Sequence, residues 1–171
     1  MRARSRAFLL VTVLLLTVIL AIAGMAFLST RSLQYQSTAR FREAAQARAL
    51  ARAGLEDARV KLQKDLRFPP PASQSQVIFA YSEDVTDLDG QPVGHYVVEV
   101  DRTWAEAPYG VLKVISTGRT GRRDRPGAQQ TIRAELDVLP TDRANPADPD
   151  PATNPNPTLF RFLRWRESQS L

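Results

Sequence analysis

The chain has 171 residues, enough for one modest domain and an anchor, and its 23 Lys and Arg residues against 18 Asp and Glu residues give a net charge of +5. It has no cysteine and a single histidine, so a disulfide framework is excluded and a Cys/His metal cluster lacks the ligands it needs. The positive charge belongs to the first part of the chain, because residues 68–171 hold eleven basic and fourteen acidic side chains.

The first predicted element is a membrane-spanning helix at residues 8–29, which carry no charge and no proline. At about 1.5 Å per residue, such a helix spans roughly 30 Å, the thickness of a bilayer's hydrocarbon core. Three interpretations stay open: a cleaved signal peptide, a permanent signal anchor, or a retained helix preceded by a cleaved leader. Arg2, Arg4 and Arg6 favour a cytoplasmic N-terminus. The residues expected to pack against neighbouring helices in the membrane are Thr12, Ala21, Ala23, Gly24 and Ala26.

The second predicted element is an amphipathic helix at residues 30–68 that continues the first without a break. Residues 31–67 contain no proline and only one glycine, Gly54, and prolines at positions 69–71 end the helix. Small and apolar side chains recur at three- and four-residue steps and therefore share one face. The stripe is mostly alanine, which favours packing on a sheet over a coiled coil. The residues expected to pack on the sheet are Ala51, Leu55, Ala58, Leu62 and Leu66.

The first sixty residues or so combine a short Arg-rich start, an apolar helix that opens with Phe8, and an Ala-rich polar segment, ALARAGLEDA, at residues 49–58. This pattern resembles the type IV pilin-like proteins, most closely the PilX-like minor pilins and the atypical pseudopilins of type II secretion. The resemblance implies a leader at residues 1–7 that a prepilin peptidase cuts between Ala7 and Phe8. It also implies an inner-membrane anchor with a periplasmic head, and other pilin or pseudopilin subunits as partners.

Two positions depart from the pattern of that family. The family's leader usually ends in glycine, where this chain has Ala7, and its major subunits carry a glutamate where this chain has Thr12. A carboxylate in hydrocarbon is costly unless it is paired, and in the family that glutamate is thought to meet the N-terminal amine of a neighbour. A subunit with Thr12 cannot make this pairing, which indicates a tip or initiating subunit, or one that never enters a filament.

The head is expected at residues 72–139 as a small antiparallel meander. Period-two alternation is clearest at residues 131–138, where the apolar side chains all face one way. The amphipathic helix offers the only apolar helix face to cover the sheet, so the predicted fold class is α+β, with a long N-terminal helix packed by its second half on the sheet. The other expected strands are residues 76–81, 94–102 and 111–117.

The predicted loops of the head carry charge. Residues 83–90 are acidic, but they lack the full spacing of a calcium loop and are equally explained by an Asp-Gly hairpin turn, so no metal site is predicted. His95 is expected on a sheet face. A nucleic-acid contact is a weaker alternative to a solvated surface for the arginines of the loop at residues 118–127. These are Arg119, Arg122, Arg123 and Arg125.

The C-terminal part divides into two segments. Residues 140–158 hold six prolines among Asp, Asn and Thr, and are predicted to be a disordered linker. In residues 159–171, apolar side chains alternate with arginines. This segment either docks on its own head or binds a partner or membrane surface through Phe160, Phe162 and Trp165.

No catalytic motif is present, so neither an enzyme nor a cofactor is predicted. The function expected from the sequence is that of a minor pilin-like structural subunit of a type IV pilus or a type II secretion-like filament, acting at its tip or in initiation. The alternative is a single-pass, signal-anchored periplasmic scaffold or sensor domain.

Overall fold

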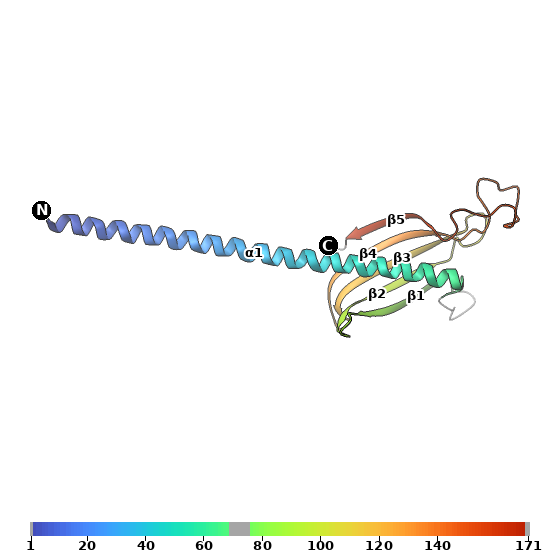
Figure 1. The fold of residues 1–171 in the computed structure, drawn as a ribbon, viewed down its shortest axis with the longest axis horizontal. Coiled ribbons are helices and arrows are strands. Elements are labelled where there is room, and N and C mark those ends of the chain that lie inside the picture. The colour runs from blue at the N-terminus through green and yellow to red at the C-terminus, as the bar shows by residue number, and fades with distance from the viewer. Residues whose placement is uncertain (1, 69–75, 170–171) are drawn as a thin grey trace. The chain divides into compact units, whose positions relative to one another are not determined.

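The computed structural model describes residues 2–68 and 76–169, with side chains from residue 13 onward. The chain forms two units, Met1–Arg42 and Glu43–Leu171. It has one long N-terminal helix and a five-stranded antiparallel sheet, which confirms the α+β class. The elements are α1 (Arg2–Lys64), β1 (Ile78–Thr86), β2 (Pro92–Asp101), β3 (Val111–Arg122), β4 (Arg125–Asp137) and β5 (Phe162–Gln169) (Figure 1).

The first unit is helical and apolar. Its large side chains from Val13 to Leu28 are exposed, and the described part of α1, Val13–Lys64, contains an 18-residue window of mean hydropathy 2.4. Thr17 donates its hydroxyl hydrogen to the carbonyl of Leu14 at 2.8 Å, so this polar group is satisfied within its own helix. The helix is thus long and apolar enough to cross a bilayer.

The second unit is a meander in which sequence neighbours pair, in the order β1-β2-β3-β4-β5. One of its features differs from the expectation. The arginine-rich residues 118–127 are not a loop, because β3 and β4 extend through them and pair as far as Arg122 and Arg125. The fifth strand comes from the C-terminal segment and pairs with β4.

Alternation along the strands gives the sheet one apolar face, and the end of α1 covers it (Figure 1). The buried face of the helix includes Leu50 and Gly54, which the predicted stripe omits. The buried core consists of Ala51, Leu55, Ala58 and Leu62 of the helix with Tyr96, Val98, Val100, Leu112, Val114, Ile132, Ala134, Leu136 and Val138.

Leu66 does not belong to this packing face, contrary to the prediction, since it is 49% exposed. The helix ends at Lys64 rather than at residue 68. The cause is Asp65, whose carboxylate accepts a hydrogen bond from the Arg67 amide at 2.8 Å while its carbonyl accepts one from Phe68 at 3.0 Å. These local bonds compete with another helical turn. The prolines at 69–71, which were expected to end the helix, lie outside the described residues.

Residues 140–158 form an ordered loop, which corrects the prediction of a disordered linker. The side-chain Nδ2 of Asn154 donates to the backbone carbonyl oxygens of Asp142, Asn145 and Asp148. Thr141 and Pro155 also form an antiparallel bridge. The backbone carbonyls of this proline-rich loop therefore have hydrogen-bond partners. The asparagine side chain supplies N–H groups that proline lacks.

Candidate functional site

The loop at residues 140–158 is tied to the sheet by one buried carboxylate, Asp137. This side chain is fully buried and accepts hydrogen bonds from Arg143 at 2.7 Å, Asn156 at 3.0 Å and Thr158 at 2.7 Å. Burial alone would raise the pKa of Asp137, but these bonds, together with one from the Leu139 amide, hold it below its ordinary value. Asp137 is therefore ionised and structural, and we call this cluster the Asp137 lock.

The segment after the lock docks on its own head. Phe160 and Phe162 are partly buried against the core, and β5 pairs with β4 over residues 162–169. Of the two interpretations left open by the sequence, the structure shows the docked one.

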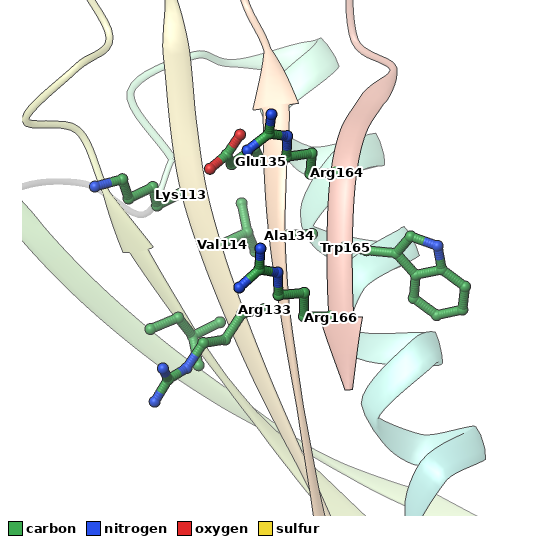
Figure 2. A pocket seen from close by; sticks show the side chains of 9 residues that line it. Lys113, Val114, Arg133, Ala134, Glu135, Arg164, Trp165 and Arg166 are labelled. Atoms are coloured by element: carbon green, nitrogen blue, oxygen red, sulfur yellow. The ribbon is translucent and has the colours of Figure 1, made fainter. Parts of the chain in front are cut away.

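Strand β5 also contacts the helix within the second unit. Glu167 forms ion pairs with Arg48 and Arg52, each at 2.9 Å. The Arg52 guanidinium carbon lies 5.1 Å from the centre of the Trp165 ring, which is 52% exposed. Since successive side chains of a strand point to opposite faces, Arg164 and Arg166 lie on the face away from the helix. Figure 2 shows them pointing across β4 while Trp165 points the other way.

This second face, which we call the outer face, carries a groove of about 410 Å³. Residues opposite each other in neighbouring strands share a face, so the register brings side chains from three strands together (Figure 2). One row contains Lys113, Glu135 and Arg164, and the next row contains Ile115, Arg133 and Arg166. We call these six residues the basic groove.

The basic groove has an unbalanced charge. It combines four cationic side chains with one carboxylate, that of Glu135. Among the described residues, Arg133, Arg164 and Arg166 make no ion pair and no side-chain hydrogen bond. The remaining cation, the ammonium of Lys113, lies 5.5 Å from the centre of the Trp104 ring. On the β2 side of the groove, Asp101 lies opposite Lys113 and Glu99 lies opposite Ile115. The positive charge that no described residue pairs is therefore that of Arg133, Arg164 and Arg166, on the β4–β5 side.

The arginines singled out from the sequence are mostly engaged elsewhere. Arg123 pairs with Asp84 at 2.8 Å, and its hydrogen bond lowers the pKa of that carboxyl. Arg122 lies 3.3 Å from Asp124, and Arg119 donates to the side-chain oxygen of Gln129 at 3.0 Å. Together with Arg125 they surround the β3–β4 turn rather than the basic groove. Sequence reasoning missed the groove, although the alternation of Arg164 and Arg166 around Trp165 is a strand signal.

His95 lies in β2 between Asp84 of β1 and Arg119 of β3. It is buried, and this burial lowers its pKa, as do the neighbouring charges of Arg123 and Arg119. No group of three His, Cys, Asp or Glu residues in the described part of the chain could hold a metal ion.

Ala21, Ala23, Gly24 and Ala26, which the sequence predicts to pack in the membrane, lie exposed on α1. A methyl group added at Gly24 would meet no atom within 4 Å. The side chains of Ala7, Phe8 and Thr12 lie outside the described part of the structure.

In comparisons with protein-family models, curated proteins and solved structures, none matched the chain.

Proposed function

We propose that this chain is a minor pilin-like structural subunit that assembles with other pilin or pseudopilin subunits, at the tip of a filament or during its initiation. In this proposal the apolar part of α1 anchors the chain in the inner membrane and packs against neighbouring helices. The sheet domain is the head, presented on the periplasmic side.

One observation carries the proposal. A single helix, α1, contains both an apolar stretch long enough to span a bilayer and the residues that complete the core of an antiparallel sheet. Removing Ala51, Leu55 and Leu62 from the sheet would uncover its apolar face. In this proposal the same helix anchors the chain and completes the core of the head. This arrangement suits a subunit that is inserted into an assembly through its membrane helix.

The test is the N-terminus of the protein isolated from membranes of cells with and without a prepilin peptidase. The proposal expects a start at Phe8 that depends on the peptidase. In the Ala7→Arg variant this cleavage is lost, because a long cation replaces the small side chain at the junction. The control, Ala3→Arg, adds the same charge to the leader and leaves the junction intact.

An intact Met1 start in both strains would contradict the proposal and favour a signal-anchored scaffold or sensor domain. A start near Met25 would indicate a secreted protein with a cleaved signal peptide.

A further inference from the structure

We propose that the turn between β1 and β2 of one copy docks into the basic groove of a second copy. The turn presents Asp87, Leu88 and Asp89, and we call these three residues the acidic tip. This inference rests on the proposed function, because it needs copies of the chain held close together in one membrane or filament.

The acidic tip complements the groove in charge. The β1–β2 hairpin, residues 78–101, holds six acidic side chains and no Lys or Arg. Glu83 and Asp84 are already paired, with Lys61 and Arg123 respectively. The unpaired carboxylates at the end of the hairpin are those of the acidic tip.

The individual contacts of the tip leave its carboxylates available. Asp87 accepts hydrogen bonds from the amides of Asp89 and Gln91 at 3.0 and 2.7 Å, both through Oδ1, and no described residue bonds its Oδ2. Among the described residues the carboxylate of Asp89 has no partner. Leu88, between them, is fully exposed.

The groove offers matching chemistry. Ile115 is the apolar side chain of the groove, with Arg133 opposite it on β4 and Glu99 opposite it on β2. A leucine placed on Ile115 from the β5 side would bring its two flanking carboxylates to Arg133, Arg164 and Arg166 and keep them away from Glu99. A single exposed leucine is ordinary, but a leucine between two free carboxylates fits this particular groove.

The tip cannot reach the groove of its own chain. Gly94 at the tip end of β2 pairs with Thr120 of β3, whereas the groove begins at Ile115 and continues to Lys113. Thr120 lies five residue steps along the strand from Ile115, about 16 Å at the usual rise, and the tip lies further out, beyond Gly94. A tip that occupies this groove must therefore belong to another copy.

A hairpin tip fits the groove better than a nucleic acid does. Glu135 lies in the middle of the row formed by Lys113 and Arg164, where it would repel a chain of phosphates. Two carboxylates on either side of a leucine can meet Arg133, Arg164 and Arg166 and avoid both Glu135 and Glu99. Because tip and groove are different surfaces, the contact is heterologous and can repeat from copy to copy.

A contact of this size is weak by itself, and anchoring raises the effective concentration of one copy near another. The test is therefore made with the full chain in its membrane. Because the chain has no cysteine, introduced cysteines are its only thiols. The variant Leu88→Cys with Ile115→Cys should give a ladder of disulfide-linked oligomers after mild oxidation, whereas the two single variants expressed together should give only dimers.

The control pair is Ala147→Cys with Ile115→Cys, in which the first cysteine lies exposed on the loop at residues 140–158. A ladder no stronger than that of the control pair would overturn the proposal. Dimers formed by Leu88→Cys alone, as efficiently as by the pair, would also overturn it, because they would indicate contact between two tips.

Charge reversal provides a second readout of the same contact. Arg166→Glu in the double-cysteine background should reduce the cross-linked fraction roughly five- to tenfold, through like-charge repulsion. Adding Asp89→Arg to this variant should restore the cross-linked fraction, because the contact again joins opposite charges. Arg67→Glu, a reversal at an exposed arginine after the helix end, should leave it unchanged. If Asp89→Arg fails to restore the cross-linking that Arg166→Glu removes, a direct contact between the tip and the groove is contradicted.

The two proposals fail separately. A peptidase-dependent start at Phe8 without the ladder leaves the pilin-like function standing and removes the tip contact. The ladder with an intact Met1 start in both strains supports the contact and removes the function. Salt-sensitive binding of a single-stranded oligonucleotide, abolished by Arg166→Glu and unaccompanied by the ladder, would assign the groove to nucleic acid instead.

Discussion

Gly118 lies where the helix and the sheet are closest. A methyl group built on this residue would stand 2.2 Å from the carbonyl oxygen of Ala47 and 2.4 Å from the amide nitrogen of Ala51. Both are backbone atoms of α1 and cannot move aside alone. The helix can therefore rest on β3 only because this position has no side chain.

We expect Gly118→Ala to reduce the free energy of unfolding of the sheet domain by about 2 kcal/mol, because the helix must shift away from β3. Thermal unfolding of the full chain in detergent measures this loss. Gly24→Ala is the matched control, since a methyl group there meets nothing within 4 Å. Equal stability of the two variants would contradict the close packing at Gly118.

The Asp137 lock gives a second prediction at the scale of single residues. Replacing Asp137 with alanine leaves Arg143, Asn156 and Thr158 without their common acceptor. Losing a buried, paired carboxylate costs about 3 kcal/mol, and the loop should open. Trypsin should then cleave after Arg143 much faster than in the unchanged chain. Asp142→Ala is the control, because within the described residues the side chain of Asp142 accepts a hydrogen bond only from the nearby amide of Ala144. Unchanged cleavage of Asp137→Ala would contradict the lock.

His95 makes the stability of the head depend on pH. Because burial lowers its pKa in the folded chain, the unfolded chain binds the proton more strongly. The free energy of unfolding should therefore fall as the pH drops below about 6.5, by at most about 1.4 kcal/mol per pH unit. Asp84 opposes the shift and the arginines at 119 and 123 enlarge it. Urea unfolding of the chain and of His95→Gln between pH 5 and pH 7.5 tests this prediction. The free energy of unfolding of the variant should not show this decrease below pH 6.5.

At the scale of elements, β5 protects the edge of the sheet. Without it, β4 would present an unpaired edge of 13 residues, which is a template for pairing with other chains. A chain that ends at residue 158 should therefore aggregate in detergent, as size-exclusion chromatography would show. Replacing Arg164 and Arg166 with alanine keeps the strand and should leave the protein monodisperse. Monodisperse behaviour of the truncated chain would contradict this role of β5.

The local patterns of the sequence predicted these elements unequally. The helix and the strand that contains Ile132 and Leu136 carry clear periodicity, so their faces could be assigned. The helix end was missed because one side chain, Asp65, competes with the next turn. The loop at residues 140–158 was missed because its partners are distant: nothing near Asn156 indicates that it will bond Asp137. The basic groove arises from the register of three strands, which no single stretch encodes.

At the scale of the whole molecule, the two units should respond separately to substitution. Gly24→Leu adds a large side chain to the apolar part of α1, where the proposed function needs small residues so that neighbouring helices can approach. We expect it to reduce co-purification with partner subunits and to leave the unfolding transition of the head unchanged. Leu20→Ile, on the same stretch, preserves side-chain size and should affect neither. A loss of head stability in Gly24→Leu would contradict this independence.

The Asp137 lock has a consequence for how the protein matures. A loop of similar length is often closed by a disulfide in exported proteins, and closure then waits for an oxidising catalyst. Here a carboxylate, a guanidinium and an amide close the loop within the folding reaction itself. The head can therefore reach its final form under reducing or oxidising conditions alike, and thiol reductants have no bond in it to break.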